Sequence, residues 1–345
     1  MSESDFRECV DGYLDDFTRY DQYVDVVSCW EEFLSNYRPF FEGYYFDRFP
    51  SMRPIGGGDD LSPDFSVLFN DSYGLVFEVS RTLPPDDERF DSEMDQIRSY
   101  DQQLLFHTGD SSTTVPERHD IVLLVSTTDS QTIAHRLQSF LNDGRLDLGS
   151  NIIPMEYTYL DQDRKAKYQF KRLSHVDQNF RDDVLPNDWQ LSKKLSMDGG
   201  TFDNIYSPVS AFYENKVTGV LCNDKPPALY LSCYIWHHVF PEIAVNQSAG
   251  NLSPRAATQL NIEAEQLKEN LVENYIPEAT IKTDWVEEAL DFLVLAEVAD
   301  PQTNGDYNVR FRNLRDKRRQ FKDVVTERTQ IRDLANLFAE WACEN

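Results

Sequence analysis

Basic residues are scarce in this sequence. Its 345 residues include 33 lysines and arginines against 60 aspartates and glutamates, a formal net charge of −27 with the histidines neutral. This charge argues against a protein that coats nucleic acid over its whole surface. Two explanations of the acidity stay open: a salt-loving host, or acidic faces that meet a basic partner and repel DNA except at chosen patches.

Paired cysteines are lacking as well. No two of the five form a Cys-x-x-Cys pair, and they are scattered over the chain as Cys9, Cys29, Cys222, Cys233 and Cys343. This spacing does not fit a zinc site, and the adjacent His237 and His238 cannot share one face of a helix. We therefore expect reduced, mostly buried thiols, as in a cytoplasmic protein.

Long hydrophobic runs are missing too, since none approaches the length of a transmembrane helix. The first residues also lack the basic and then apolar pattern of a signal peptide. These absences predict a soluble, cytoplasmic protein with no membrane partner. Hydrophobic residues still make up 40% of the chain, which is enough to form a core. The length favours two domains over one.

A β-hairpin is predicted over residues 64–81. Two apolar-rich runs of strand length, 64–69 and 75–81, flank a cluster of turn residues. With the turn centred near Ser72, Asp64 is expected opposite Ser80, and Glu78 two residues further along the same face. Two carboxylates thus converge on the less apolar face of the hairpin. On the hairpin alone, two solvated carboxylates on an exposed face explain the pattern equally well.

A helix is predicted after the hairpin, capped by Asp91 or Ser92 and reaching about residue 106. Gln96 and Tyr100 are four residues apart, so they lie on one face of this helix.

Three short motifs in this region, in this order, resemble the PD-(D/E)XK nuclease superfamily. They are Pro63-Asp64, Glu78-Val79-Ser80 and Gln96-x-x-x-Tyr100, the last of which is similar to a motif of the RecB-like branch. The resemblance covers about the first half of the chain. It implies that Asp64 and Glu78 bind Mg²⁺, with Mn²⁺ as a substitute, and that the ion activates a water for attack on a phosphodiester of DNA. It also implies that Gln96 and Tyr100 position the substrate strand or the catalytic groups.

The sequence departs from the family pattern at Ser80. The family has a lysine at this position, and a serine cannot stabilise charge on an attacking or leaving oxygen as an ammonium does. Arg81 points to the other face and could substitute only through a bulge, and Arg98 on the helix is a further candidate. The resemblance therefore supports the fold more than the activity. A DNA endonuclease is one reading, and a catalytically inactive DNA-binding or scaffold subunit of a larger complex is the alternative.

The order of predicted elements in residues 1–180 favours an α/β/α sandwich with a mixed sheet, restriction-endonuclease-like in its layout. It comprises a helix within 8–48, the hairpin, the helix after it, a strand at 119–126, a helix at 132–141 and a strand at 151–160. Residues 181–223 are expected to connect this domain to the next one.

Residues 224–345 are predicted to form a mainly α, winged-helix-like domain. Three helices precede a two-stranded ribbon with its tip at 299–306, and a helix at about 329–343 closes the chain. The third helix carries Glu287, Glu288 and Asp291, which would repel DNA phosphates in a major groove. The winged helix or the closing helix is therefore a candidate site for a protein partner. A restriction, repair or mobile-element defence role would fit by analogy.

Two local basic clusters stand out from the acidic background, and both are predicted to contact DNA phosphates. They comprise Lys165, Lys167, Lys171 and Arg172, and then Arg310, Arg312, Arg315, Arg318 and Arg319. For the first cluster the alternative is a solvated strand edge on which lysines discourage pairing. For the second it is contact with an acidic face of the protein itself.

Overall fold

A computed structural model describes the chain in twelve stretches. They are residues 2–35, 44–70, 72–80, 87–110, 112–128, 130–162, 165–173, 201–205, 221–247, 258–275, 281–311 and 324–344. Its contacts divide the chain into two compact units, one formed by Asp25–Tyr206 and the other by Met1–Val24 together with Ser207–Asn345. Helix α1 (Glu3–Ser35) contributes to both units. Among the residues that the structure describes, no helix is both long enough and apolar enough to cross a membrane.

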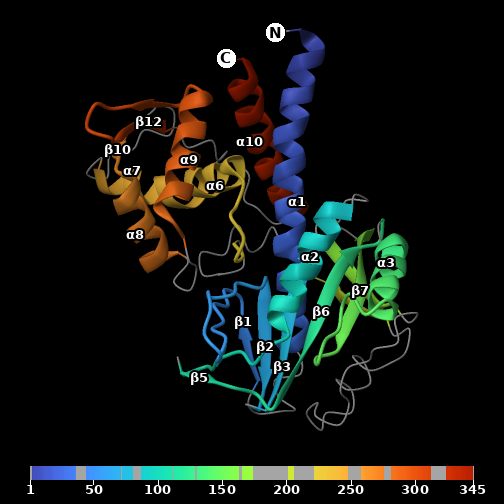
Figure 1. The fold of residues 1–345 in the computed structure, drawn as a ribbon. Coiled ribbons are helices and arrows are strands. Elements are labelled where there is room, and N and C mark those ends of the chain that lie inside the picture. Colours follow the sequence, from blue (N-terminus) through green and yellow to red (C-terminus); the bar gives the residue numbers. More distant parts are fainter. Residues whose placement is uncertain are drawn as a thin grey trace. The chain divides into compact units, whose positions relative to one another are not determined.

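A seven-stranded mixed sheet forms the centre of the Asp25–Tyr206 unit, in the order β1-β2-β3-β6-β7-β8-β9 (Figure 1). Its strands are β1 (Tyr44–Asp47), β2 (Phe65–Phe69), β3 (Tyr73–Ser80), β6 (Arg118–Ser126), β7 (Ile152–Gln162), β8 (Lys165–Arg172) and β9 (Thr201–Ile205). Strands β3, β6 and β7 are parallel, and the other neighbours are antiparallel. Separately, β4 (Phe106–His107) and β5 (Thr113–Thr114) form a small ribbon.

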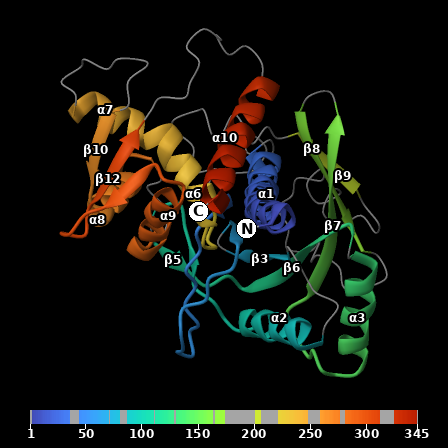
Figure 2. The same ribbon diagram turned by 90° about the horizontal axis from the view of Figure 1, so that it is seen from above.

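Helices cover both faces of this sheet, as the view in Figure 2 shows. Helices α2 (Asp87–Tyr100) and α3 (Ser130–Asn142) share one buried core with strands β2, β3, β6 and β7. The second half of α1 covers the opposite face, where Trp30 packs against Phe65 and Phe77. Because β6 is buried between two layers, its central residues form a continuous apolar run. The predicted mixed α/β class is confirmed.

The register of the β2–β3 hairpin differs from the expected one. Phe65 pairs with Phe77 and Phe69 pairs with Tyr73, so the turn is centred one residue earlier than Ser72. Asn70 enters the turn with a φ of 47°, a left-handed conformation that asparagine tolerates. The pairing is thereby displaced by two residues, which leaves every side chain on its predicted face.

A three-stranded sheet and several helices make up the other unit. Its helices are α6 (Ala228–Tyr234), continued by the π-helix η2 (Ile235–Val239) and α7 (Phe240–Gln247), then α8 (Ala264–Asn274), α9 (Thr283–Leu295) and α10 (Val324–Glu344). Its strands are β10 (Thr258–Ile262), β11 (Ala299–Pro301) and β12 (Tyr307–Phe311), in the order β10-β12-β11. The predicted ribbon differs in two ways: its first strand, β11, lies within the 299–306 segment that was expected to be the tip, and a third strand, β10, pairs with β12.

The first 24 residues belong to this second unit, and not to the unit that holds most of the domain predicted over residues 1–180. Aromatic side chains on the first half of α1 account for the difference. Tyr13 packs edge-on against Phe292 of α9, and Phe17 packs against Tyr230 of α6. A helical stripe in the sequence predicts a buried face, but it does not say which part of the chain covers that face.

Cys9 and Cys343 form a disulfide, which corrects the expectation that all five cysteines are reduced. The bond joins α1 to α10 across a separation of 334 residues. Cysteine spacing in a sequence indicates only local pairs, so a disulfide between such distant residues could not be predicted from it. The other three, Cys29, Cys222 and Cys233, are buried thiols that form no disulfide among the described residues.

Candidate functional site

The hairpin and helix α2 bring four of the predicted site residues together. The Gln96 side chain donates a 2.8 Å hydrogen bond to the Tyr100 hydroxyl. That hydroxyl in turn donates a 2.9 Å bond to the Glu78 carboxylate on β3. The spacing of four residues places the exposed Gln96 one turn before the buried Tyr100, so that its side chain reaches the Tyr100 hydroxyl. The Gln-x-x-x-Tyr motif is therefore directed at the glutamate of the hairpin.

Asp64 precedes β2 directly, at the open end of the hairpin. Its backbone amide donates to the carbonyl of Phe77 at 3.1 Å. Its carboxylate accepts a 2.5 Å hydrogen bond from the backbone amide of Val79. The printed pairing of the hairpin ends at Phe65 and Phe77, so Asp64 lies just outside the regular ladder and is not opposite Ser80 as expected. Its bonds to Phe77 and Val79 hold Asp64 beside the part of β3 that carries Glu78.

These side chains are buried, which excludes the alternative of two solvated carboxylates on an exposed face. The exposed fraction is 4% for Asp64, 8% for Glu78, 5% for Ser80 and 1% for Tyr100. A carboxylate withdrawn from water needs hydrogen-bond donors or positive charge to compensate for lost hydration. The amide of Val79 and the hydroxyl of Tyr100 are two such donors.

The proton on Tyr100 is held firmly. Burial raises the pKa of its hydroxyl well above the usual 10, and the negative charges of Glu78 and Asp64 add to the rise. The hydrogen bond from Gln96 lowers this pKa, but it is outweighed. Tyr100 therefore stays neutral and acts as a donor to Glu78 throughout the physiological range.

The carboxyl end of α2 is anchored to neighbouring strands, which fixes where Tyr100 lies. The carbonyl oxygen of Tyr100 is 2.8 Å from the Nε2 atom of His119 on β6. The carboxylate of Asp101 accepts bonds of 2.7 Å from the backbone amides of Gly149 and Ser150. Burial lowers the pKa of His119, which favours the neutral ring that donates to this carbonyl. His119 and Asp101 could not be predicted from the sequence, because no local pattern marks residues that meet only after folding.

Asp64 and Glu78 supply the donor set for a hard cation. Within the described stretches no three histidine, cysteine, aspartate or glutamate residues are grouped so that they could hold a metal ion. Mg²⁺, however, keeps several waters and commonly takes only one or two protein carboxylates. Asp64 and Glu78 are two carboxylates near the open end of the hairpin, which is the number of protein ligands that such an ion commonly takes.

Two basic residues were expected to substitute for the ammonium that the family places at the position of Ser80, and only Arg98 lies within the described residues. Arg98 is turned away, since its guanidinium donates to the carbonyl of Arg145 at 2.7 Å and is paired with Asp95. Arg81, the other candidate, lies outside the described residues.

The predicted phosphate-binding residues of the first basic cluster differ in their surroundings. The Lys171 side chain is 48% exposed and pairs with Glu156 on β7 at 3.3 Å. The cross-strand partners Ser80, Val125, Glu156 and Lys171 form one row over the sheet, so Lys171 lies on the face that carries Ser80. Arg172 is 3% exposed, and burial does not fit a surface contact with phosphate. The side chains of Lys165 and Lys167 lie outside the described part of the structure.

The second basic cluster falls almost entirely outside the described residues, which include none of Arg312, Arg315, Arg318 and Arg319. Arg310 is described, on β12. It forms a 2.5 Å ion pair with Asp300 and donates to the carbonyl of Glu297. Its guanidinium therefore ties β12 to β11 and the end of α9.

Comparisons with protein-family models, with curated proteins and with solved structures find no significant match. Any assignment of function therefore depends on the geometry of the site. The feature with most bearing on function is the chain of hydrogen bonds from Gln96 through Tyr100 to Glu78, beside Asp64.

Proposed function

We propose that the Asp25–Tyr206 unit is a nuclease-like domain that binds Mg²⁺ between Asp64 and Glu78 and hydrolyses phosphodiester bonds of DNA. The observation that carries the proposal is the bond from Tyr100 to Glu78, because it joins two motifs of the PD-(D/E)XK resemblance that lie 22 residues apart. If Glu78 lay on a solvated strand and Tyr100 on a solvated helix, no buried hydrogen bond between them would be expected.

The topology supports a restriction-endonuclease-like arrangement. The chain runs from α1 through β1, β2 and β3 to α2, and then through β6 and α3 to β7. Glu78 and Ser80 lie at the carboxyl end of β3, beside the parallel strand β6. In open α/β sheets, ligands bind outside the carboxyl ends of parallel strands. The site thus occupies the part of the sheet where this class of fold places its chemistry.

Each residue has a distinct part in this proposal. Asp64 and Glu78 would hold the ion, and a bound Mg²⁺ would lower the pKa of a water that attacks the phosphodiester. Tyr100 orients the Glu78 carboxylate through its hydroxyl proton, and Gln96 orients that hydroxyl. The amide of Val79 fixes one oxygen of Asp64. A rigid arrangement of ligands costs little reorganisation during the reaction.

Ser80 favours a second candidate, a nuclease-like subunit that binds DNA or organises a complex without cleaving. Removing one preorganised group that stabilises developing charge slows an enzyme by about 10²–10³-fold. A serine at the position of the lysine therefore fits either a slow nuclease or an inactive relative. The two candidates share the metal site and differ in whether bound DNA is cut.

The order of elements in the second unit supports the proposal that it is a winged-helix-like domain that contacts protein. Strand β10, helices α8 and α9 and the β11–β12 ribbon follow one another, and the sheet order places β12 in the middle. On α9, Glu288 pairs with Lys225, and Asp291 accepts a 2.8 Å bond from Tyr307. The acidic face of α9 disfavours insertion into a major groove. In α10 the apolar side chain of Phe338 packs on Trp236 of the same unit, so this face is already covered.

A cleavage assay tests the proposal. The purified chain is incubated with single- and double-stranded DNA and Mg²⁺ or Mn²⁺, beside Asp64→Asn and Glu78→Gln. Asp95→Asn is the matched control, since Asp95 is an exposed carboxylate on α2 that pairs with Arg98. We expect metal-dependent cleavage that both site variants lose and the control keeps. DNA binding without cleavage would favour the second candidate, and cleavage that survives both site variants would refute the assignment of the site.

A further inference from the structure

The disulfide between Cys9 and Cys343 holds a part of α1 that is otherwise poorly attached. Residues 2–12 are all exposed or half-buried, and the first buried side chain of α1 is that of Phe17. The aromatic contact nearest to the disulfide on this helix is made by Tyr13, which packs on α9. The bond therefore secures about three turns of α1 that have no buried residue.

The polar contacts described for these first three turns are local to α1. One example is the ion pair of Arg7 with Glu3 at 2.6 Å. Asp5, Glu8 and Asp11 follow one another at intervals of three residues. Like charges one turn apart destabilise a helix, and a helical segment this short is marginal in water without tertiary contacts. We therefore expect the order of this segment to depend on the cross-link.

Helix α10 depends much less on the bond. Phe338 and Ala339 are fully buried, and the ring of Phe338 packs on Trp236 of η2. Cys343 is itself only 2% exposed, whereas Cys9 is half-buried. Breaking the bond therefore leaves α10 in its place and releases the end of α1.

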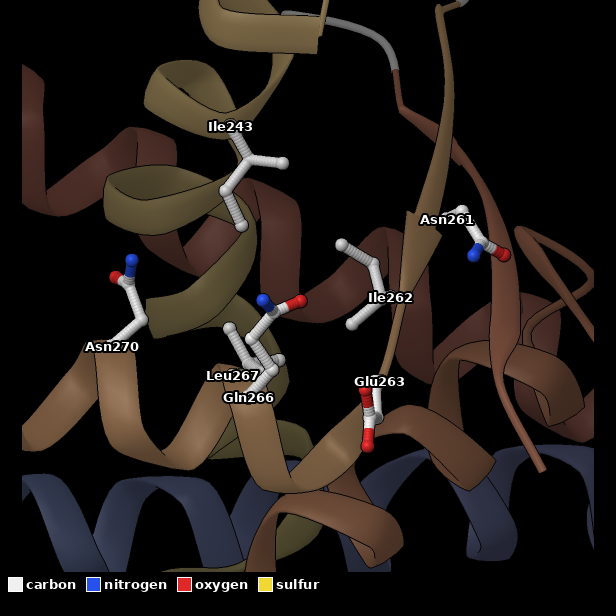
Figure 3. Close-up of a pocket in the computed structure, with 7 residues that line it drawn as sticks. All are labelled: Ile243, Asn261, Ile262, Glu263, Gln266, Leu267 and Asn270. Carbon is white, nitrogen blue, oxygen red and sulfur yellow. The ribbon is translucent and has the colours of Figure 1, made fainter.

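A thiol reductant reaches the bond from the surface beside Cys9. A small pocket of the same unit, about 160 Å³ between α7, β10 and α8, is lined by no cysteine (Figure 3). The attacking thiolate bonds to the Sγ atom of Cys9, and the electron pair of the broken S–S bond leaves on the Sγ atom of Cys343, which takes up a proton. A second thiolate then attacks the added sulfur, and Cys9 leaves and is protonated. Two reductant thiols are thereby oxidised to one disulfide.

Negative charge on both helices selects among reductants. Asp5 precedes Cys9 by four residues and Glu340 precedes Cys343 by three, so each carboxylate lies one turn from a cysteine on the same face of its helix. Cys343 also lies in the last turn of α10, where the helix dipole is negative. These charges repel an anionic thiol and do not repel a neutral or cationic one.

We infer that the Cys9–Cys343 bond is a redox-sensitive switch, which a neutral or cationic thiol opens and which thereby frees the first three turns of α1. While the bond is intact, this acidic helix end stays tied to α10. After reduction the Cys343 thiol stays buried, and residues 2–12 lose their cross-link. Both cysteines belong to the unit that contains Ser207–Asn345, so the switch is separate from the proposed metal site.

Hydrogen exchange of the full chain, followed by mass spectrometry, tests the release. We expect amide exchange in residues 6–12 to be at least about tenfold faster after reduction with 2-mercaptoethanol, with no change over residues 332–342. Cys9→Ser should exchange fast with or without the thiol, and Cys222→Ser should respond as the wild type does. Equal exchange in the oxidised and the reduced wild type would overturn the inference, as would release of α10 together with α1.

Three thiols of similar size test the dependence on charge. They are 2-aminoethanethiol, 2-mercaptoethanol and 2-mercaptoethanesulfonate, which are cationic, neutral and anionic. Each rate of reduction is divided by the rate of the same thiol with a small neutral disulfide. We expect the cationic thiol to be at least about fivefold faster than the anionic one at low salt, and less than about twofold faster in 1 M salt, where charges are screened beyond about 3 Å. Equal normalised rates at low salt would contradict the inference.

Variants separate the charges beside the bond from the general acidity of the protein. Asp5→Asn and Glu340→Gln together are expected to reduce the ratio between the cationic and the anionic thiol at least about twofold at low salt. Asp333→Asn is the matched control, since Asp333 is an exposed carboxylate on α10 about three turns before Cys343. It should leave the ratio unchanged. An equal reduction by the control would mean that the neighbouring carboxylates do not select the reductant.

Discussion

The hydroxyl of Tyr100 lies 2.9 Å from the carboxylate of Glu78 and donates a hydrogen bond to it. Tyr100 ends α2 and Glu78 lies within β3, so this bond fixes the helix on the sheet at the point where the hairpin opens. Both side chains are at least nine-tenths buried. The bond therefore contributes to stability as well as to the geometry of the proposed metal site, and the two contributions can be measured separately.

Replacing Tyr100 by phenylalanine removes the donor and leaves the ring. Because Glu78 is buried, we expect the free energy of unfolding to fall by about 1–3 kcal/mol. Urea denaturation of both proteins measures it. The matched control is Tyr13→Phe, since Tyr13 makes a ring contact with Phe292 that the change preserves. A loss for Tyr100→Phe no larger than that of the control would mean that the bond adds nothing.

Introducing the missing ammonium should raise activity. In Ser80→Lys we expect Mg²⁺-dependent cleavage of DNA to rise at least tenfold over the wild type, because a preorganised cation stabilises charge on the reacting oxygens. Ser80→Met is the control, with a long side chain and no charge. Thermal unfolding of both variants accompanies the assay, since Ser80 is buried. A rise in both variants, or in neither, would show that Ser80 is not the position that limits the chemistry.

Stability should depend on the protonation of His119. Burial lowers the pKa of this ring below its ordinary value, so the unfolded chain binds the proton more readily than the folded one. The contribution of neutral His119 to the free energy of unfolding is complete above the pKa of the ring in the unfolded chain, about 6.5. It is lost as the pH falls below that value. We expect the stability difference between the wild type and His119→Gln to shrink between pH 7 and pH 5, by at most about 1.4 kcal/mol per pH unit. A difference that stays constant over this range would exclude a buried neutral histidine.

The disulfide between Cys9 and Cys343 predicts three reactive thiols in the unfolded, unreduced protein, since Cys29, Cys222 and Cys233 are free. Titration with a thiol reagent in denaturant, with and without prior reduction, should count three and five. Removing the bond in Cys9→Ser should lower the stability by about 2–5 kcal/mol, because a cross-link between the chain ends restricts the unfolded state. Cys222→Ser is a buried control that leaves the bond intact. Five thiols without reduction would contradict the disulfide.

Much of the central sheet could be predicted from local patterns. The apolar run at 119–126 corresponds to β6, and the amphipathic segment at 132–141 lies within α3. The faces of the hairpin were also predicted correctly, because alternation along a strand survives a shift of two residues. The register itself was wrong, since it depends on the exact length of the turn. The helix predicted to reach residue 106 ends at Tyr100, and Phe106 instead begins β4.

Contacts between distant parts of the chain could not be predicted. The bond between His119 and the carbonyl of Tyr100, the seating of the first half of α1 on α6 and α9, and the Cys9–Cys343 pair all depend on tertiary packing. The strand β1 was missed because its four residues fall in a region read as helical. The residues of the proposed site could be named from the sequence because they belong to short motifs. Their contacts with one another, such as the bond from Tyr100 to Glu78, needed the structure.

Calorimetric titration of the chain with Mn²⁺ tests the metal site most directly, before any substrate is known. The account predicts one bound ion per chain in the wild type, no binding in Asp64→Asn, and unchanged binding in Asp95→Asn. Unfolding curves of the three proteins show whether each is folded during the titration. No binding in the wild type, or equal binding in Asp64→Asn, would contradict the central claim that the carboxylates of Asp64 and Glu78 form a metal site.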